Sequence, residues 1–466
     1  MWRGLIHRAS DAMEAGRSAT PPIVARNFPR RPRSQGQWSR AVDYAGDVVQ
    51  RVHGAMDGGR PAMVKPDEWA IFAIAVAPFI AQHRLSSSRK PMRIEAAVLR
   101  HAGLPPPYAK SKPLEIAELD LSPPGRGEVL VKMAAAGLCH SDLSVIDGSR
   151  PRPTPMALGH EAAGIVEAVG DGVTDLEAGD HVVLVFVPSC GRCGPCASGR
   201  PALCEPAAKA NAAGTLLSGA RRLSFHAEPI NHLLGVAAFS THAVVARESC
   251  VKIDPDLPLE LAALFGCAVL TGVGAVVNTA KLEPGQSAAV VGLGGVGLSV
   301  VLGARLAGAR QIVAVDLSDE KLAFATKLGA TQTVNARSND AVGEIRRLSG
   351  NGVDVAFEMA GSVPALELAY AATARGGATV TAGLPHPDNR MSLSPLALVA
   401  EERTLKGSYV GSSAPQRDVP RLIALFRAGR LPVDQLLTHR LKLEEINEGF
   451  DRLREGVGVR QVIVFE

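Results

Sequence analysis

The stretch from Ala288 to Asp316 reads AAVVGLGGVGLSVVLGARLAGARQIVAVD, and it decides the fold class of this part of the chain. A short apolar run ends in the pattern G-x-G-x-x-G at Gly292, Gly294 and Gly297. A helix-like segment follows over residues 298–308, and a second apolar run then ends in an acid. Strand, glycine-rich turn, helix and strand in this order are typical of a βαβ unit that binds a dinucleotide.

Each glycine of the pattern has a separate physical task. Gly292 permits a tight turn, Gly294 lets the backbone approach a pyrophosphate, and Gly297 lets the helix pack closely on the strand. The free N–H groups at the helix start, around Gly295 and Val296, then point at the phosphates. A plain glycine-rich turn is the alternative, and the complete strand, helix and acid order argues against it.

Asp316 indicates which dinucleotide binds. It follows Gly297 by 19 residues, close to the usual spacing of about 20 for the acid that contacts the adenosine ribose. A carboxylate there accepts hydrogen bonds from the ribose hydroxyls and repels a 2′-phosphate. The sequence therefore predicts NAD as cofactor in preference to NADP.

The bulk composition excludes several classes of protein. The chain has 466 residues, 46% hydrophobic and 21% charged, with a net charge of +4. This weak basic balance argues against a dedicated nucleic-acid-binding protein. No apolar run reaches the 18 or so residues of a membrane span, and the longest candidate, 69–81, contains Pro78. We therefore expect a globular chain of two or three domains with no membrane partner.

The hydrophobic pattern changes along the chain. Residues 1–91 begin with an Arg-, Pro- and Ser-rich stretch, and we expect this extension to be largely disordered. An organelle transit segment and an upstream start codon, with Met92 as the true initiator, both remain open. Apolar runs that alternate with turn residues predict a β-rich domain, a partly closed barrel, at 94–99, 128–133, 164–170 and 181–187. From 269 to 411 strands alternate with helices, which predicts an α/β fold with a doubly wound parallel sheet.

A compact cysteine cluster predicts a metal site. Cys190, Cys193, Cys196 and Cys204 form a C-x2-C-x2-C-x7-C pattern with glycines between them. Four thiolates satisfy tetrahedral zinc and leave no open position, which indicates a structural site. An iron–sulfur cluster is the rival, but its fourth cysteine normally follows after about three residues and precedes proline. Clustered thiols without a clear secretory signal indicate a reducing compartment, the cytoplasm.

Three further segments each contain an isolated candidate ligand. They are GLCHSD at 137–142, LGHEAAG at 158–164 and GCAVLTG at 266–272. Each candidate alone is more often a packed core residue than a ligand. Together with the cysteine cluster and the dinucleotide unit, however, they resemble the zinc-dependent alcohol dehydrogenases of the medium-chain dehydrogenase/reductase family. The resemblance covers 92–466 and includes INEGF at 446–450.

The resemblance implies a domain plan and two zinc ions per subunit, one catalytic and one structural. The plan is a GroES-like catalytic domain over 92–268 with its structural zinc lobe at 190–204, a Rossmann NAD-binding domain over 269–411, and a return to the catalytic domain over 412–466. It also implies a homo-oligomer, either a dimer or a tetramer. Residues 1–91 have no counterpart in the family.

The resemblance also assigns roles to single residues. Cys139, His160 and Cys267 are the implied catalytic zinc ligands, with a fourth position open for an alcohol oxygen. Ser141 takes the alcohol proton, Asp142 orients His160, and Glu161 lies behind the zinc. The implied cofactor contacts, besides the glycine motif and Asp316, are His140, Thr271, Lys321 and Arg460. A turn-capping hydroxyl is the alternative for Ser141, and a solvated surface position is the alternative for Lys321.

The implied reaction is hydride transfer between NAD and a primary aliphatic or aromatic alcohol or its aldehyde. Phe186 and Leu233 match lining positions of the substrate channel, and Arg150 and Lys209 fall where pocket-mouth residues are expected. Many relatives carry a histidine three residues after Ser141 that passes the proton to solvent, whereas this chain has Ser144. The proton relay is then expected to use ribose hydroxyls and water.

Two other functions remain alternatives. A formaldehyde dehydrogenase acting on S-hydroxymethylglutathione would carry an arginine four residues after the last lobe cysteine, where this chain has Ala208 beside Lys209. A zinc-ribbon protein that binds nucleic acid through the basic N-terminal arm is the second alternative. The weak net charge and the second set of metal ligands argue against it.

Overall fold

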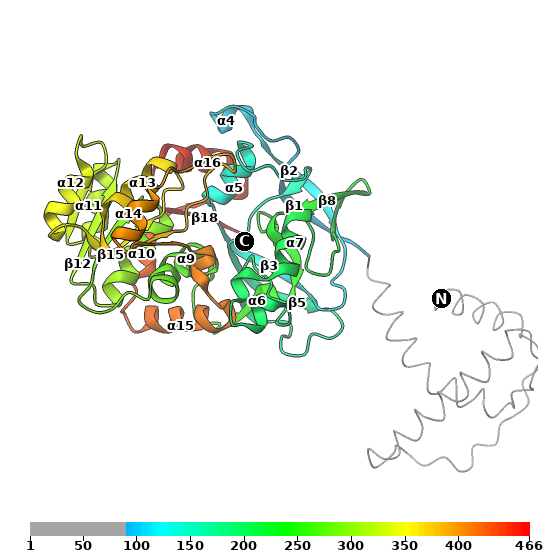
Figure 1. The fold of residues 1–466 in the computed structure, drawn as a ribbon. Helices are drawn as coiled ribbons and strands as arrows, with labels where there is room; N and C mark the ends of the chain where they lie inside the picture. Colours follow the sequence, from blue (N-terminus) through cyan, green and yellow to red (C-terminus); the bar gives the residue numbers. More distant parts are fainter. Residues whose placement is uncertain (1–89) are drawn as a thin grey trace, which may run out of the picture. The chain divides into compact units, whose positions relative to one another are not determined.

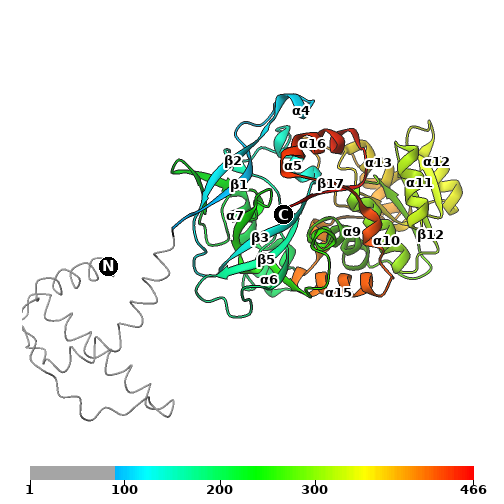
Figure 2. The same ribbon diagram turned by 180° about the vertical axis from the view of Figure 1, so that it is seen from behind.

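The computed structural model describes residues 90–466, and the predictions made for residues 1–89, including their disorder, lie outside the described residues. The predicted fold class is confirmed for the described chain, which combines a β-rich part with a doubly wound α/β part. In Figure 1 the α/β part, with α11, α12 and α13, lies at one end of the described unit, and the β-rich part with β1, β3 and β5 lies at the other. Figure 2 shows the same arrangement from behind, with α9 and α16 between the two parts.

The α/β part contains a sheet of six parallel strands in the order β13-β12-β11-β14-β15-β16. The strands are β11 (Ser287–Val291), β12 (Gln311–Asp316), β13 (Gln332–Asn335), β14 (Val353–Glu358), β15 (Thr373–Thr381) and β16 (Thr404–Gly407). This is the strand order 3-2-1-4-5-6 of a Rossmann fold. The order reverses beside β11, so the glycine-rich turn after β11 lies at the point where such sheets bind their ligands.

The sheet is buried on both faces, which explains why β11 reads as a continuous apolar run. Ala288 and Val290 of β11 pack in one hydrophobic layer with α10 (Gly295–Leu306) and α11 (Asp319–Leu328). Their neighbours Ala289 and Val291 pack in the opposite layer with α12 (Ala341–Ser349) and α13 (Val363–Ala372). The alternation follows from the two-residue period of side chains along a strand.

The β-rich part contains a closed barrel and a second sheet. The barrel strands are β1 (Met92–Leu99), β2 (Leu114–Leu121), β7 (Leu223–Phe225), β8 (Glu228–His232) and β4 (Met156–Ala157). The second sheet, of seven strands, has β3 (Glu128–Gly137) near its centre and comprises also β5 (Ala162–Val169), β6 (His181–Leu184), β9 (His242–Ala246), β10 (Cys250–Ile253), β17 (Leu437–Leu441) and β18 (Arg460–Val464). Because β17 and β18 come from the end of the chain, the C-terminal residues complete a sheet that begins near residue 128.

Shorter helices connect these sheets. They are α4 (Tyr108–Ser111), α5 (His140–Ile146), α6 (Gly194–Ala197), α7 (Glu205–Ala213), α8 (Leu259–Ala262), α9 (Ala268–Gly274), α14 (Pro395–Ala400), α15 (Pro415–Arg427) and α16 (Ile446–Glu455), with a π-helical turn η5 (Ala275–Ala280) after α9. The 3-10 turns are η1 (Pro201–Leu203), η2 (Leu233–Gly235), η3 (Arg247–Ser249), η4 (Ala263–Gly266), η6 (Tyr409–Ser412), η7 (Val433–Leu436) and η8 (Leu443–Glu445).

Within residues 90–466, no single helix has the length and apolar character needed to cross a membrane. A bent pair, Leu259–Gly266 and Ala268–Ala280, meets the criterion only when its two helices are taken together. Most residues of this pair are buried inside the protein, where the pair links the second sheet to the α/β part.

Candidate active site

Strand pairing brings the first two metal-ligand candidates together. Ala136 of β3 lies opposite Ala162 of β5, and the Gly137 N–H donates to the Glu161 carbonyl oxygen at 2.7 Å. Cys139 follows two residues after the end of β3, and His160 precedes β5. The pairing of β3 with β5 therefore brings the two ligand-bearing segments next to each other.

Cys267 reaches this position from a segment more than 100 residues later in the chain. It lies between η4 and α9, whose N-terminal cap it forms. The preceding Gly266 packs directly on β6, because a Cβ atom there would lie 2.4 Å from the Leu184 carbonyl oxygen. Leu184 in turn pairs with Ala162 of β5, two residues after His160. The contact of Gly266 with β6 therefore brings Cys267 close to His160.

The resulting cluster is compact and buried. Ligand atoms of Cys139, His160, Glu161 and Cys267 all lie within 4.8 Å of one another. His160 Nε2 lies 3.5 Å from Cys267 Sγ, and its Nδ1 lies 3.2 Å from a carboxylate oxygen of Asp142. Asp142 is itself held by the Gly159 N–H, which donates to it at 3.0 Å. The imidazole is therefore oriented so that Nε2 faces the two sulfur atoms.

These atoms fit a zinc ion. Zinc bound at about 2.3 Å to sulfur and 2.0–2.1 Å to nitrogen holds its tetrahedral ligand atoms about 3.5–3.8 Å apart, which matches the His160–Cys267 distance. The contact with Cys267 lowers the pKa of Cys139, and the contact with Cys139 raises the pKa of Cys267. Two thiolates side by side repel each other, and a divalent cation between them removes this conflict.

Glu161 and Arg460 connect this cluster to the glycine-rich turn. The Arg460 guanidinium forms an ion pair with the Glu161 carboxylate, and both side chains are buried. The Cδ atom of Arg460 also lies so close to the start of α10 that a Cβ at Gly295 would approach it to 2.4 Å. Arg460 therefore contacts both the group of candidate metal ligands, through Glu161, and the predicted pyrophosphate site. It reaches this place because Val462 of β18 pairs with Gly137 of β3.

The glycine-rich turn has the conformation that the sequence predicts. Gly292 has a φ of +91°, which only glycine adopts readily. A Cβ at Gly297 would lie 1.8 Å from the Gly292 carbonyl oxygen, whereas a Cβ at Gly294 would meet nothing within 4 Å. Gly297 is therefore required by packing, and the open space at Gly294 lies where a ligand can approach the backbone.

Asp316 lies beside this turn at the end of β12. Its carboxylate accepts hydrogen bonds from the backbone N–H of Leu293 at 2.7 Å and of Ser318 at 3.0 Å. Lys321 lies in the first turn of the next helix, α11, and its ammonium group lies near Gly456. His140 is exposed at the start of α5.

The cysteine lobe gathers its four sulfur atoms within 4.8 Å of one another. Backbone N–H groups donate to them, from Cys190 to the Cys204 sulfur at 3.3 Å and from Cys193 to the Cys190 sulfur at 3.4 Å. The backbone N–H groups of Arg192 and Cys193 lower the pKa of the Cys190 thiol to about 7. Burial raises the pKa of Cys196 to about 12, so a cation is needed to hold all four sulfurs as thiolates, and zinc fits this all-sulfur donor set.

A cavity opens beside Cys139 and Cys267 and reaches both parts of the protein. Phe186 and Leu233 line it from the β-rich part, together with Ser141. The cavity also reaches Thr271 and Val296, next to the glycine-rich turn. The predicted metal, substrate and nicotinamide positions therefore adjoin one cavity between the two parts.

Comparisons with known proteins agree with this arrangement. Residues 125–255 match the alcohol dehydrogenase GroES-like domain, and residues 295–428 match the zinc-binding dehydrogenase domain. A zinc-binding-domain alcohol dehydrogenase protein from Burkholderia ambifaria is 36% identical, with a TM-score of 0.76, over 80% of this chain and 99% of its own. The benzyl alcohol dehydrogenase of Acinetobacter calcoaceticus is 34% identical, with a TM-score of 0.75, over 80% of this chain and 100% of its own. A Sinorhizobium meliloti 1021 protein solved with NADP bound is 25% identical, with a TM-score of 0.66, over 80% of this chain and 100% of its own.

This chain belongs to the zinc-dependent alcohol dehydrogenases of the medium-chain dehydrogenase/reductase family. The family resemblance drawn from the sequence is thereby confirmed, as are the GroES-like and Rossmann folds.

Some lining residues of this alcohol dehydrogenase were not singled out from the sequence. Arg152 and Tyr409 both line the cavity, and Arg150 joins them there, whereas Lys209 is exposed on α7 and is not among the lining residues. Tyr409 follows β16, and residues just past the carboxyl ends of parallel strands are expected near a ligand. That rule could have pointed to Tyr409. Arg152 offered no comparable signal beyond its place in the Arg150-Pro151-Arg152 run.

The departure from the family at Ser144 also has a defined geometry. The Ser144 hydroxyl donates to the Ser141 carbonyl oxygen at 2.9 Å, so it is engaged with the backbone of its own helix. Ser144 is not among the residues that line the cavity.

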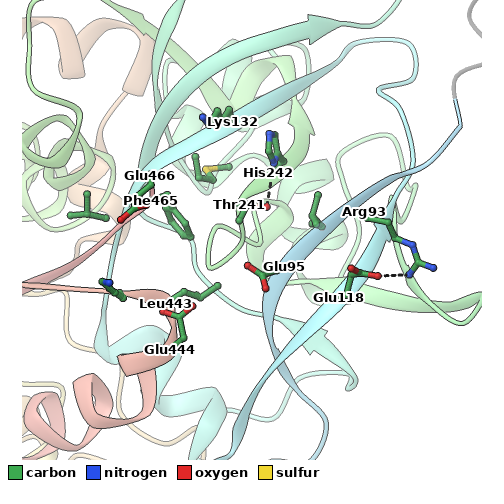
Figure 3. Close-up of a pocket in the computed structure, with 14 residues that line it drawn as sticks. Arg93, Glu95, Glu118, Lys132, Thr241, His242, Leu443, Glu444, Phe465 and Glu466 are labelled. Atoms are coloured by element: carbon green, nitrogen blue, oxygen red, sulfur yellow. Dashed lines mark hydrogen bonds and ion pairs between the residues drawn. The ribbon is translucent and has the colours of Figure 1, made fainter.

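A second, larger cavity lies away from the metal ligands, between β1, β3 and the C-terminal residues (Figure 3). Its lining mixes both signs of charge, and Figure 3 shows the ion pair between Arg93 and Glu118, whose atoms lie 3.2 Å apart. Lys132, His242 and Glu95 also line it. Neither of the two clusters of candidate metal ligands within the described chain adjoins this cavity.

Proposed function

We propose that this alcohol dehydrogenase transfers a hydride between NAD and a primary aliphatic or aromatic alcohol, or the corresponding aldehyde. The observation that carries the proposal is the cluster of Cys139, His160 and Cys267, because Cys139 and Cys267 line a cavity that also adjoins Thr271 and Val296. An alcohol in this cavity has metal-ligand atoms on one side and the dinucleotide site on the other.

Two zinc ions per subunit form part of the proposal. Cys139, His160 and Cys267 would hold one, and the four lobe cysteines would hold the other. Bound to these three ligands, zinc would supply Lewis acidity that makes an alcohol easier to deprotonate. The lobe, which offers four sulfur ligands and does not line the cavity, is assigned a structural role.

We assign proton transfer and the positioning of His160 to side chains at or near the cavity. Ser141 lines the cavity beside Cys139, and its hydroxyl is placed to accept the alcohol proton. Asp142 fixes the ring of His160 through its contact with Nδ1, and it thereby acts as a positioning residue. Since the Ser144 hydroxyl is hydrogen-bonded to the Ser141 carbonyl oxygen, we assign onward proton transfer to ribose hydroxyls and water.

The assignment of NAD rests on Asp316. Its carboxylate is held at the end of β12 by the N–H groups of Leu293 and Ser318, and an acid at this position of a Rossmann unit binds the adenosine ribose. His140, Lys321 and Arg460 are assigned to the phosphate and ribose groups, because Arg460 adjoins the helix start, Lys321 carries an ammonium group on α11, and His140 offers ring nitrogens at the start of α5.

Simple alcohols are preferred over a glutathione adduct on structural grounds. The Phe186 ring packs edge to face against the His160 ring, with centroids 5.2 Å apart, and against the Tyr409 ring, with centroids 6.2 Å apart. Phe186 and Tyr409 both line the cavity, so its wall is partly aromatic. The Acinetobacter relative is a benzyl alcohol dehydrogenase. The exposed Lys209 offers no support for a bound glutathione carboxylate in this cavity.

We also infer a cytoplasmic homo-oligomer, a dimer or tetramer. Strand β16 forms an edge of the parallel sheet, and the neighbouring Leu396 and Val399 are 77% and 75% exposed. An open strand edge beside exposed apolar side chains favours association with another copy. Light scattering after gel filtration tests this inference, and a monomer at all protein concentrations contradicts it.

Metal analysis combined with an alcohol panel tests the proposed function. We expect two zinc ions per chain, and oxidation of benzyl alcohol and 1-butanol with NAD faster than that of S-hydroxymethylglutathione. Cys267→Ser should lower kcat by a factor of about 100 or more while the lobe keeps its zinc, because one catalytic ligand is lost. Cys250→Ser, which changes a buried thiol outside both clusters, is the matched control. Full activity of Cys267→Ser contradicts the assignment.

A further inference from the structure

The strongest unassigned feature is a pair of guanidinium groups at the substrate cavity. Arg150 and Arg152 both line it, together with Cys139, Phe186 and Tyr409. Each arginine is half-buried, and neither forms an ion pair with a carboxylate among residues 90–466. Elsewhere in the described chain many arginines do pair with acids, as Arg222 does with Glu128.

The two arginines differ in how firmly they are held. The Arg152 guanidinium donates to the Asn211 carbonyl oxygen at 3.3 Å, and the Asn211 side-chain amide donates to the Phe186 carbonyl oxygen at 2.9 Å. Arg152 is thus fixed to the wall that carries Phe186. The side chain of Arg150 has no hydrogen bond within the described part of the chain, so its donors are free to bind a ligand.

The two guanidinium groups also lie close enough to repel each other electrostatically. Burial and the neighbouring Arg150 guanidinium together lower the pKa of Arg152. Two like charges beside a cavity are unfavourable unless an anion binds between them. A guanidinium presents paired donors that match a carboxylate.

The metal site does not supply this anion. Two thiolates from Cys139 and Cys267 cancel the formal charge of one zinc ion, so the loaded site leaves the positive charge of the arginines uncompensated. The aromatic pair Phe186 and Tyr409 adjoins the same cavity and provides an apolar surface for a flat ring. The lining thus offers a metal site, an aromatic wall and a cationic site to one ligand.

We propose that the substrate is an aromatic primary alcohol, or its aldehyde, with a carboxylate on the ring position remote from the reacting carbon, and that Arg150 and Arg152 bind this carboxylate. This inference rests on the proposed alcohol dehydrogenase function and refines its substrate class. Hydride and proton transfer at the alcohol carbon and oxygen remain as in that function, and the carboxylate itself does not react.

A matched pair of substrates tests the proposal in the zinc-loaded enzyme. 4-(Hydroxymethyl)benzoate and 4-methylbenzyl alcohol have similar shape and differ in charge. We expect kcat/KM of the wild type to favour the carboxylate, and Arg150→Met to lower this preference by about ten- to a hundredfold, as expected on losing a charge-assisted hydrogen bond. Arg150→Lys should keep part of the preference, since the charge remains. Raised salt should weaken the preference in the wild type.

Arg430→Met is the matched control, because Arg430 is exposed, does not line the cavity, and has no side-chain bond within residues 90–466. It should behave like the wild type. A wild type that prefers 4-methylbenzyl alcohol, or a preference that is unchanged in Arg150→Met, overturns the inference while leaving the alcohol dehydrogenase function intact.

Calorimetric titration separates this result from failure of the proposed function. If neither alcohol is oxidised with NAD or NADP, the proposed function fails, and binding of 4-(hydroxymethyl)benzoate still tests the anion site. Binding that weakens about tenfold or more in Arg150→Met supports the site. Absence of binding, or equal binding by both proteins, overturns it.

Discussion

At the scale of single residues, we propose that Asp316 sets the choice between NAD and NADP. Its carboxylate is fixed by two backbone N–H groups, so it presents a negative charge at a defined place. Asp316→Gly should lower the NAD-to-NADP ratio of kcat/KM by about tenfold or more, because a hydrogen-bond acceptor and a repulsive charge are both lost. Steady-state rates with the two cofactors measure the ratio. A ratio equal to that of Asp388→Gly, an exposed control, contradicts the role of Asp316.

His232 determines part of the response of stability to acid. It is fully buried, its Nε2 accepts the Arg222 N–H at 3.0 Å, and burial together with Arg221 and Arg222 lowers its pKa from 6.5 to about 3. Above pH 6.5 the histidine is neutral in both the folded and the unfolded chain, so it contributes nothing. Below that pH the unfolded chain binds the proton first, and stability is lost until about pH 3.

His232→Gln should remove this contribution, since its amide oxygen can accept the same N–H. Between pH 7 and pH 5 the wild type should lose about 2 kcal/mol more unfolding free energy than His232→Gln. Urea unfolding of both proteins at the two pH values measures the difference. Equal losses of unfolding free energy in the two proteins would contradict this role of His232.

At the scale of elements, the turn between β11 and α10 contains one glycine that packing requires, Gly297, and one that we assign to ligand binding, Gly294. Gly297 has a carbonyl oxygen 1.8 Å from the place of an added Cβ, whereas Gly294 has open space there and an ordinary φ of −76°. The chain therefore needs Gly297 to fold this element and needs Gly294 only when a dinucleotide approaches.

Two alanine variants distinguish these needs. Gly297→Ala should lower stability by about 1–3 kcal/mol, as overpacking does, and should also weaken NADH binding. Gly294→Ala should keep the wild-type urea midpoint and weaken NADH binding alone. Fluorescence titration with NADH alongside urea unfolding gives both readouts. Equal loss of stability in the two variants contradicts this distinction.

At the scale of the whole molecule, the site depends on the far C-terminal residues of the chain. Strand β18 pairs with β3 and carries Arg460 to Glu161, while both clusters of metal-ligand candidates lie within residues 90–466. The sheet that holds Cys139 is incomplete without β18. The described unit therefore contains the cavity and its ligands.

Two truncations test this view of the molecule. A protein that begins at Lys90 should keep kcat/KM for benzyl alcohol within about twofold, because its site residues all lie in one self-contained unit. Removal of residues 460–466 should abolish activity and lower the unfolding midpoint, because β18 and the Arg460–Glu161 pair are lost. Loss of activity in the first protein would show that residues 1–89 take part in the site.

The sequence by itself determined the features whose residues are close along the chain. The glycine-rich turn, the acid at Asp316 and the lobe cysteines each lie within about 30 residues, so spacing alone indicates a shared structure. Cys139, His160 and Cys267 lie too far apart for spacing to relate them, and only the resemblance to a family joined them before the structure was considered.

Tertiary structure alone decided the contacts between distant segments. The register of β3 with β5 and of β5 with β6 sets the distances among the three ligands, and β18 sets Arg460 against Glu161. Arg152 and Tyr409 reach one cavity although more than 250 residues separate them. Such contacts depend on strand pairing and on packing between two domains, and local residue patterns carry little information about either.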